Sequence, residues 1–100
     1  MTTEGNGTVY EVKYSLNLKK IIIQLHLEEA DRGRGQQFLD ALRVIHQRLR
    51  RDPIQFGEPL FHLRALKLVV YQAVVARVVV EYVVHEERPL VFLKDVKLLD

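Results

Sequence analysis

The chain begins with a short segment in which side chains alternate along the backbone. Between residues 9 and 15, VYEVKYS, the residues Tyr10, Val12 and Tyr14 fall on one side of an extended chain, and the other side is mostly polar. A period of two carried by aromatic and β-branched residues is typical of a β-strand with one buried face. We therefore expect a strand over residues 9–15.

The next segment, residues 18–29, is predicted to be a helix. Leu18, Ile22 and Leu25 recur about once per helical turn, and Asn17 stands where an N-cap side chain is favoured. The isoleucines at 21–23 also suit a strand. The charged and amide residues around them do not alternate, however, and this favours the helix.

Residues 36–51 carry the most regular helical pattern in the chain, with apolar residues at spacings of four, three and four: Phe38, Leu42, Ile45 and Leu49. Two glycines in the preceding segment 30–35, ADRGRG, predict a corner between the two helices. The second helix is expected to end at Asp52, because Pro53 disfavours helical backbone in the residue before it. Residues 56–59, Phe-Gly-Glu-Pro, are then expected to form a turn.

The last third of the chain is rich in valine and predicts three strands. These are residues 66–72, 76–84 and 90–96, with Ala73-Val74-Val75 as the first separator and HEERP, 85–89, as a hairpin turn. Alternation in the middle strand places four apolar residues on the face expected to meet the helices: Val78, Val80, Tyr82 and Val84.

The predicted order of elements is strand, helix, helix and three strands. This order indicates an α+β fold in which a two-helix hairpin packs on one face of an antiparallel sheet. The N-terminal strand is expected to join the same sheet, but the sequence does not indicate which strand it pairs with. We expect residues 1–8 to be a flexible tail and residues 9–100 to be a single domain.

The composition agrees with one folded domain of 100 residues. Hydrophobic residues make up 48% of the chain and charged residues 28%, which excludes a disordered protein. The chain has no cysteine, which excludes disulfides and thiolate metal sites and fits the reducing cytoplasm. No apolar run approaches the roughly 18 residues that cross a bilayer, and the polar start lacks a signal-peptide pattern.

Several segments resemble parts of the RelE/ParE toxin family of bacterial toxin–antitoxin systems: Leu-Arg-Arg-Asp-Pro (49–53), Phe-Gly-Glu-Pro-Leu (56–60), Val-Val-Val-Glu-Tyr-Val-Val (78–84) and Leu-Val-Phe-Leu-Lys-Asp-Val (90–96). With the order of elements, the resemblance extends from Tyr10 to Leu99. It implies a small toxin that a cognate antitoxin wraps and silences. RelE-like members cut messenger RNA on the ribosome, whereas ParE-like members poison DNA gyrase.

The resemblance also implies where a nuclease site would lie. RelE-like nucleases carry an arginine early in the middle strand and a tyrosine soon after it, to which Arg77 and Tyr82 correspond here at a wider spacing. Lysines near the preceding strand belong to the same pattern, and Lys67 matches one. The last strand of the nucleases runs into a basic segment with an arginine and a tyrosine. Here it keeps Lys94 and Lys97 but has neither of those residues.

Cleavage of RNA through its 2′-hydroxyl requires proton transfer and cations that balance the phosphate charge. The resemblance makes Arg77, Lys67 and Lys94 the phosphate-holding candidates. His85, with an unperturbed pKa of about 6.5, is the nearby side chain suited to proton transfer. The alternative is that Arg77 and Glu81 form an ion pair across the sheet and that His85 is an ordinary hairpin residue.

A basic block on the second helix is a candidate nucleic-acid interface. The net charge is only +2, yet six arginines lie between residues 32 and 51. Clustered arginines bind phosphates in a salt-dependent way, and the candidates are Arg43, Arg48, Arg50 and Arg51, together with Lys97. The alternative is a solvated helix face whose cations suit the negative end of the helix dipole.

The remaining patterns concern metals and partners. The four histidines lack metal-ligand spacing and no paired-carboxylate motif accompanies them, so we expect neither a metal nor a cofactor. The long valine-rich strands predict sheet edges that a partner covers, either an antitoxin or a second copy of the chain. Ribosome-bound messenger RNA and gyrase are the targets that the resemblance implies. The working hypothesis is a toxin-family protein that cleaves messenger RNA on the ribosome and is neutralised by an antitoxin. The competing hypothesis is a non-catalytic or degenerate toxin-fold module, acting by protein contact or present as an inert homodimer.

Overall fold

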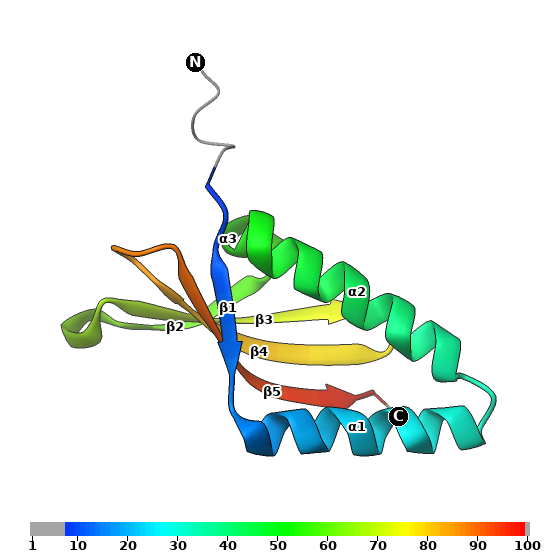
Figure 1. Ribbon diagram of the computed structural model, residues 1–100. Helices are drawn as coiled ribbons and strands as arrows, with labels where there is room; N and C mark the ends of the chain where they lie inside the picture. Colours follow the sequence, from blue (N-terminus) through cyan, green and yellow to red (C-terminus); the bar gives the residue numbers. More distant parts are fainter. Residues whose placement is uncertain (1–7, 100) are drawn as a thin grey trace.

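The computed structural model describes residues 8–99, which form a five-stranded sheet with two long helices on one face (Figure 1). The strands are β1 (Glu11–Tyr14), β2 (Glu58–Leu63), β3 (Leu68–Val75), β4 (Val78–His85) and β5 (Leu90–Leu98). The helices are α1 (Leu16–Asp31), α2 (Gly35–Arg51), the short α3 (Pro53–Phe56) and the 3-10 turn η2 (Arg64–Leu66). The predicted α+β class is confirmed.

The sheet is mixed, with the strand order β1-β5-β4-β3-β2. Strand β1 runs parallel to β5, and the other neighbours are antiparallel. The expectation of a wholly antiparallel sheet is therefore wrong at β1. Parallel neighbours need a long connection, and the two helices and three further strands between β1 and β5 provide it. The place of β1 at the edge of the sheet therefore depends on where this long connection brings the chain back beside β1.

The strand β2 was not predicted, because residues 56–59 were expected to form only a turn. Two features hide it in the sequence. Pro59 has no N–H group to donate, and the pairing with β3 shifts between Pro59 and Phe61, which breaks the alternation. Proline and such a bulge are both tolerated at a sheet edge, and β2 is an edge strand.

Strand β3 continues to Val75, so the separator expected at 73–75 is wrong. The turn lies instead at Ala76 and Arg77, directly after the expected separator, and Ala76 adopts a positive φ of 56°. The alternation of Tyr71, Ala73 and Val75 toward the core continues to the end of the strand. A tight two-residue connection places φ > 0 in the turn, and no glycine marks it in this sequence.

The first helix begins earlier than expected, at Leu16, and its N-cap is Ser15 rather than Asn17. The Ser15 hydroxyl accepts a hydrogen bond from the Leu18 amide at 3.0 Å, as an N-cap side chain does. Asn17 lies inside the helix. The helical interpretation of the isoleucine-rich segment is confirmed.

The core lies between the helices and the covered face of the sheet. The predicted stripe of α2 supplies the buried side chains of Phe38, Ile45 and Leu49. The predicted inward face of β4 is also confirmed, because Val78, Val80, Tyr82 and Val84 are all buried. The Tyr82 hydroxyl donates a hydrogen bond to the Pro53 carbonyl at 2.7 Å, which joins β4 to the start of α3.

The helices do not cover the whole sheet. The loop ends of β2, β3 and β4 project past them on the left of Figure 1. Of the predicted tail, residues 1–8, only Thr8 lies within the described residues, and it is exposed. In residues 8–99, no helix is long and apolar enough to cross a membrane.

Candidate functional site

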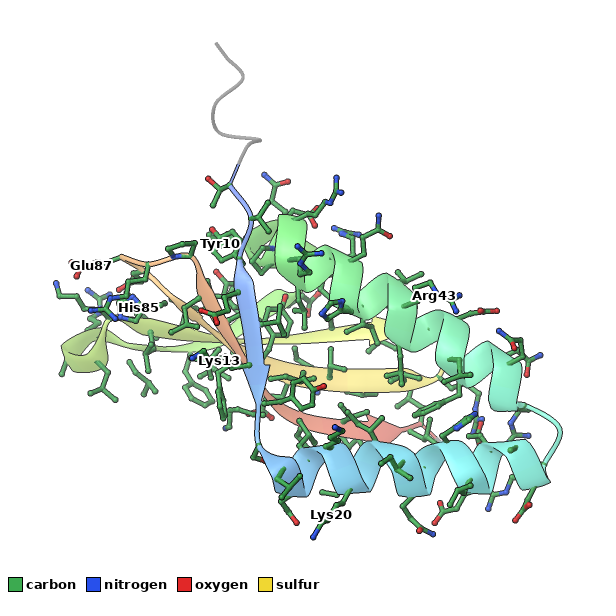
Figure 2. The ribbon with its side chains drawn as sticks, viewed as in Figure 1. Tyr10, Lys13, Lys20, Arg43, His85 and Glu87 are labelled. Carbon is green, nitrogen blue, oxygen red and sulfur yellow. The ribbon has the colours of Figure 1, made fainter. Side chains whose placement is uncertain are left out.

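A recess lies around Tyr10, where the end of α2 approaches the β4–β5 hairpin. It consists of two adjoining hollows of about 810 Å³ and 530 Å³, which share the lining residues Thr8, Tyr10 and Ile54. Figure 2 shows Tyr10 and His85 at this same end of the molecule. We call it the Tyr10 recess.

The Tyr10 recess gathers residues from both predicted sites. Arg48 and Arg51 of the basic block line the first hollow, and the catalytic candidate His85 lines the second. Arginines and carboxylates are equally numerous in the lining, which contains Arg48, Arg51, Arg88, Asp52, Glu86 and Glu87. The recess therefore has no cationic excess with which to bind a phosphate.

One wall of the recess contains Tyr71, which belongs to a stack of three aromatic residues. Tyr71 stacks on Tyr82 with ring centroids 5.4 Å apart, and Phe56 stacks on Tyr82 at 6.0 Å. Burial raises the pKa of the Tyr71 and Tyr82 hydroxyls, so both are neutral near pH 7. For Tyr71 and Tyr82 the available signal in the sequence was their inward position on two alternating strands.

Arg48 is held in place at the edge of this wall. Its Nε donates to Asp52 Oδ1 at 2.8 Å, and its guanidinium lies 4.8 Å from the centre of the Phe56 ring. The hydrogen bond to Asp52 raises the Arg48 pKa above its ordinary value. Through its contacts with Asp52 and Phe56, Arg48 holds the end of α2 against α3. Arg48 therefore has a structural role whether or not it binds a ligand.

His85 and Lys67 come together at the β4–β5 hairpin. Leu68, next to Lys67, pairs with His85 across the sheet, and the Glu86 amide donates to the Lys67 carbonyl at 2.9 Å. His85 Nδ1 accepts from the Glu87 amide at 3.0 Å, and Lys67 Nζ lies 3.2 Å from the Glu87 carboxylate. Glu87 of the hairpin thus contacts both catalytic candidates, His85 and Lys67.

Arg77 lies at the opposite end of β4. His85, the last residue of β4, lies eight positions after Arg77, and at about 3.3 Å per residue this distance is roughly 25 Å. One guanidinium nitrogen of Arg77 donates to Glu29 Oε1 at 3.1 Å, and another donates to the Leu99 carbonyl at 2.8 Å. Arg77 and His85 therefore do not share a site.

Glu29 is the centre of a cluster that joins α1 to the β3–β4 turn. It is only 3% exposed, and Arg34 makes two hydrogen bonds to it at 3.0 and 3.1 Å. Arg77 donates a third, and Arg32 lies 3.6 Å away. The bonds from Arg34 contribute most to a pKa of Glu29 below its ordinary value, although burial opposes the shift. The carboxylate stays ionised at neutral pH.

Lys94 and Lys97 lie on the face of the sheet that the helices leave uncovered. The pairing of β4 with β5 shifts at Lys94, which is the extra residue of a bulge. Its Nζ donates to Glu81 at 2.9 Å, so Glu81 does not pair with Arg77 as the alternative interpretation expected. Lys97 pairs across the sheet with Val79.

Arg43 and Arg50 are exposed on α2. Arg43 donates to Asp40 at 2.9 Å and points away from the sheet (Figure 2). The carbonyl of Arg50 accepts a hydrogen bond from the Tyr10 amide at 2.8 Å. The basic block is thus distributed along the helix, and only Arg48 and Arg51 line the Tyr10 recess.

The uncovered face of the sheet is apolar at the end away from Lys97. Register places two rows of side chains across four strands, and we call their apolar members the apolar sheet face: Phe61, Leu63, Leu68, Val70, Val83, Leu90 and Phe92. His85 is the β4 residue of the second row, and Val70 is buried beneath its neighbours. Phe61 and Phe92 are about half exposed. A hollow of about 170 Å³ lies between Leu68, Val83 and Phe92. Such contiguous apolar surface is typical of a protein interface.

We compared the chain with protein-family models, with curated proteins and with solved structures, and nothing matches in any of the three. Within residues 8–99, no group of three or more His, Asp or Glu side chains is placed to hold a metal ion. The contacts of the described residues are therefore the basis for a functional proposal.

Proposed function

We propose that the chain is a RelE/ParE-like toxin-family protein that acts by protein contact and is neutralised by an antitoxin. The resemblance of its sequence to that family supports the assignment. So does the arrangement of the described residues, in which a strand and a two-helix hairpin precede the antiparallel strands β2 to β5.

The observation that favours contact over cleavage is the separation of the three phosphate-holding candidates. Arg77, Lys67 and Lys94 lie at the two ends and in the middle of the sheet, and each contacts a carboxylate. Stabilising the charge of a phosphoryl transition state requires cations that converge on one point. These three lysine and arginine side chains do not converge.

The apolar sheet face and the neighbouring edge strand β2 are the surface that we assign to the antitoxin or to a target protein. All six residues of β2 are exposed, and its outer backbone edge can pair with an added strand. The apolar side chains beside it would give such a strand its specificity. Both features lie at the end of the sheet that projects past the helices (Figure 1).

Expression of the chain alone in a bacterial host tests this proposal. We expect growth arrest without cleavage of messenger RNA, because the protein acts by contact. We also expect Phe92→Asp to abolish the arrest by placing a charge on the apolar sheet face. The matched control is Val44→Asp on α2, since Val44 is 43% exposed and Phe92 is 44% exposed. Absence of arrest with the wild-type chain would contradict the toxin assignment.

Ribonuclease activity is the second candidate function, because the Tyr10 recess holds His85 beside Tyr71 and Arg88. The same expression experiment distinguishes it. Transcripts cleaved by the wild-type chain but left intact by His85→Ala would establish the nuclease and contradict action by contact. Arrest with DNA damage and intact transcripts would instead support a gyrase target, as in ParE-like members of the family.

A further inference from the structure

The outer side of α1 is apolar although it faces away from the molecule. Leu16, Ile23 and Leu27 are 69%, 52% and 56% exposed. The inner side of the helix already carries its own apolar residues, Leu18 and Ile22, which pack in the core. The helix lies along the lower border of the molecule in Figure 1, with no other element beneath it. This second apolar side has no partner among the described residues.

The spacing on this outer side is that of a helix that packs against another helix. Leu16, Lys20, Ile23, Leu27 and Ala30 follow each other at four, three, four and three residues. At 100° per residue they fall within an arc of roughly 80°. Two-stranded coiled coils use this repeat, and a single lysine within it fixes the register of the pair. We call these five residues the α1 seam.

The charges of α1 run opposite to those that suit a solitary helix. Acidic residues stabilise a helix N-terminus and basic residues its C-terminus. The first turn of α1 has no acidic residue and its last turn has no basic residue. Lys19 and Lys20 instead lie in the N-terminal half, where the helix dipole is also positive. Glu28 and Asp31 lie near the C-terminus, where the helix dipole is also negative.

A second α1 in antiparallel orientation complements this charge distribution. Lys20 of each helix then lies beside Asp31 of the other, which is roughly 200° around the helix from Glu29 and its arginines. The two helix dipoles also oppose. Lys19, Lys20 and Asp31 take part in no ion pair within residues 8–99, so these charges are available. Figure 2 shows Lys20 pointing away from the rest of the molecule.

We propose that the chain forms a two-fold symmetric dimer in which the α1 seams of two copies pack antiparallel. Ile23 of each copy contacts Leu27 of the other. Lys20 lies opposite the small Ala30, and its ammonium group reaches Asp31 of the second copy. The same patch serves both copies, as two-fold symmetry requires. This interface is separate from the apolar sheet face, so the proposal does not depend on the proposed function.

Sedimentation equilibrium of the full chain tests the dimer. Two sixteen-residue helices bury less than the roughly 800 Å² per partner of stable complexes, so loading concentrations of about 1 to 500 μM are needed. We expect a monomer–dimer equilibrium that Ile23→Glu/Leu27→Glu weakens by roughly 10- to 100-fold, because it places charge in an apolar contact. A monomer at every concentration would overturn the proposal.

The matched control is Ile54→Glu/Leu66→Glu, which changes two apolar residues of similar exposure, 54% and 62%, away from α1. This variant is expected to dimerise like the wild-type chain. A dimer that Ile23→Glu/Leu27→Glu leaves intact would contradict the α1 seam as the interface. Circular dichroism of both variants verifies that each has kept its helices.

Charge exchange tests the orientation of the two helices. Lys20→Glu and Asp31→Lys are each expected to weaken the dimer about tenfold, because each puts like charges side by side. The double variant Lys20→Glu/Asp31→Lys restores the pairing between copies and is expected to recover the wild-type affinity. Failure of the double variant to recover would contradict the antiparallel register.

The absence of cysteine from the chain permits a direct geometric test. A mixture of the single variants Ile23→Cys and Leu27→Cys is expected to form the mixed disulfide under mild oxidation, as seen by mass spectrometry. Two Ile23→Cys chains lie too far apart to bridge in the antiparallel dimer, because a disulfide needs Cα atoms within about 7 Å. Predominant linkage of Ile23→Cys to itself would show a parallel pair.

Discussion

The two long helices have similar lengths but are held to the molecule in different ways. Helix α2 buries one apolar stripe, including Phe38, Ile45 and Leu49, and exposes arginines on its other side. Helix α1 fully buries only Leu18 and Glu29. It is fastened by its ends, through the Ser15 cap and the arginine cluster around Glu29. Ile22 and Leu25 also pack against the core from the inner side of α1. The exposed apolar residues of its outer side, Leu16, Ile23 and Leu27, are outside this core and are free for a partner.

Removing a buried side chain from α2 is expected to have the largest effect on folding. Leu49 is 1% exposed, so Leu49→Ala leaves a cavity in the core. We expect the free energy of unfolding to fall by about 2–5 kcal/mol, measured by urea denaturation. A loss below about 1 kcal/mol would mean that the α2 stripe does not fix the helix on the sheet.

Removing the carboxylate that anchors α1 is expected to have the next largest effect. Glu29→Gln takes away the charge that Arg34, Arg77 and Arg32 share, so we expect a lower Tm at pH 7. The folded-state pKa of Glu29 lies below its ordinary value of 4.5. Its contribution to stability is therefore fully present above pH 4.5 and is lost as the pH falls through the folded-state pKa.

The pH profile separates this electrostatic anchor from simple packing. Wild-type Tm is expected to decline more steeply than the Tm of Glu29→Gln as the pH is lowered below 4.5, since only the wild-type chain must protonate Glu29. Parallel declines for the two proteins, measured by differential scanning calorimetry, would show that the charge does not anchor α1.

The smallest effect is expected on the outer side of α1. Leu27→Ala removes the same atoms as Leu49→Ala, but the Leu27 side chain is 56% exposed. We expect the free energy of unfolding of the monomer to change by no more than about 0.5 kcal/mol. Urea denaturation at low protein concentration tests this. A loss of about 2 kcal/mol would mean that this side of α1 is packed in the monomer.

Parts of the candidate site were evident from the pattern of residues, and others were not. Arg48, Arg51 and His85 were selected from a basic block and from the chemistry of histidine, and all three line the Tyr10 recess. Tyr10 and Tyr71 were missed because an inward aromatic residue of a strand is usually core. The bond between Arg77 and Glu29 joins residues 48 positions apart, and no local pattern reports such a contact.

The elements that local periodicity determines were predicted well. The edge strand β2 and the direction of strand β1 were not. The stripe of α2, its end before Pro53 and the inward face of β4 all follow from spacing within one segment. The strand β2 was hidden by Pro59 and by the shift before Phe61, and its pairing with β3 compensates for both. The parallel direction of β1 depends on where the connecting helices return the chain.

The sequence by itself determined that this is an α+β protein with two helices and a valine-rich sheet, because each of these properties is a period or a composition of adjacent residues. Only the tertiary structure decided that Arg77, Lys67 and Lys94 lie apart, that Glu29 is buried among arginines and that Leu16, Ile23 and Leu27 face outward. Burial and convergence are relations between distant segments, and the packing of helices on the sheet sets them.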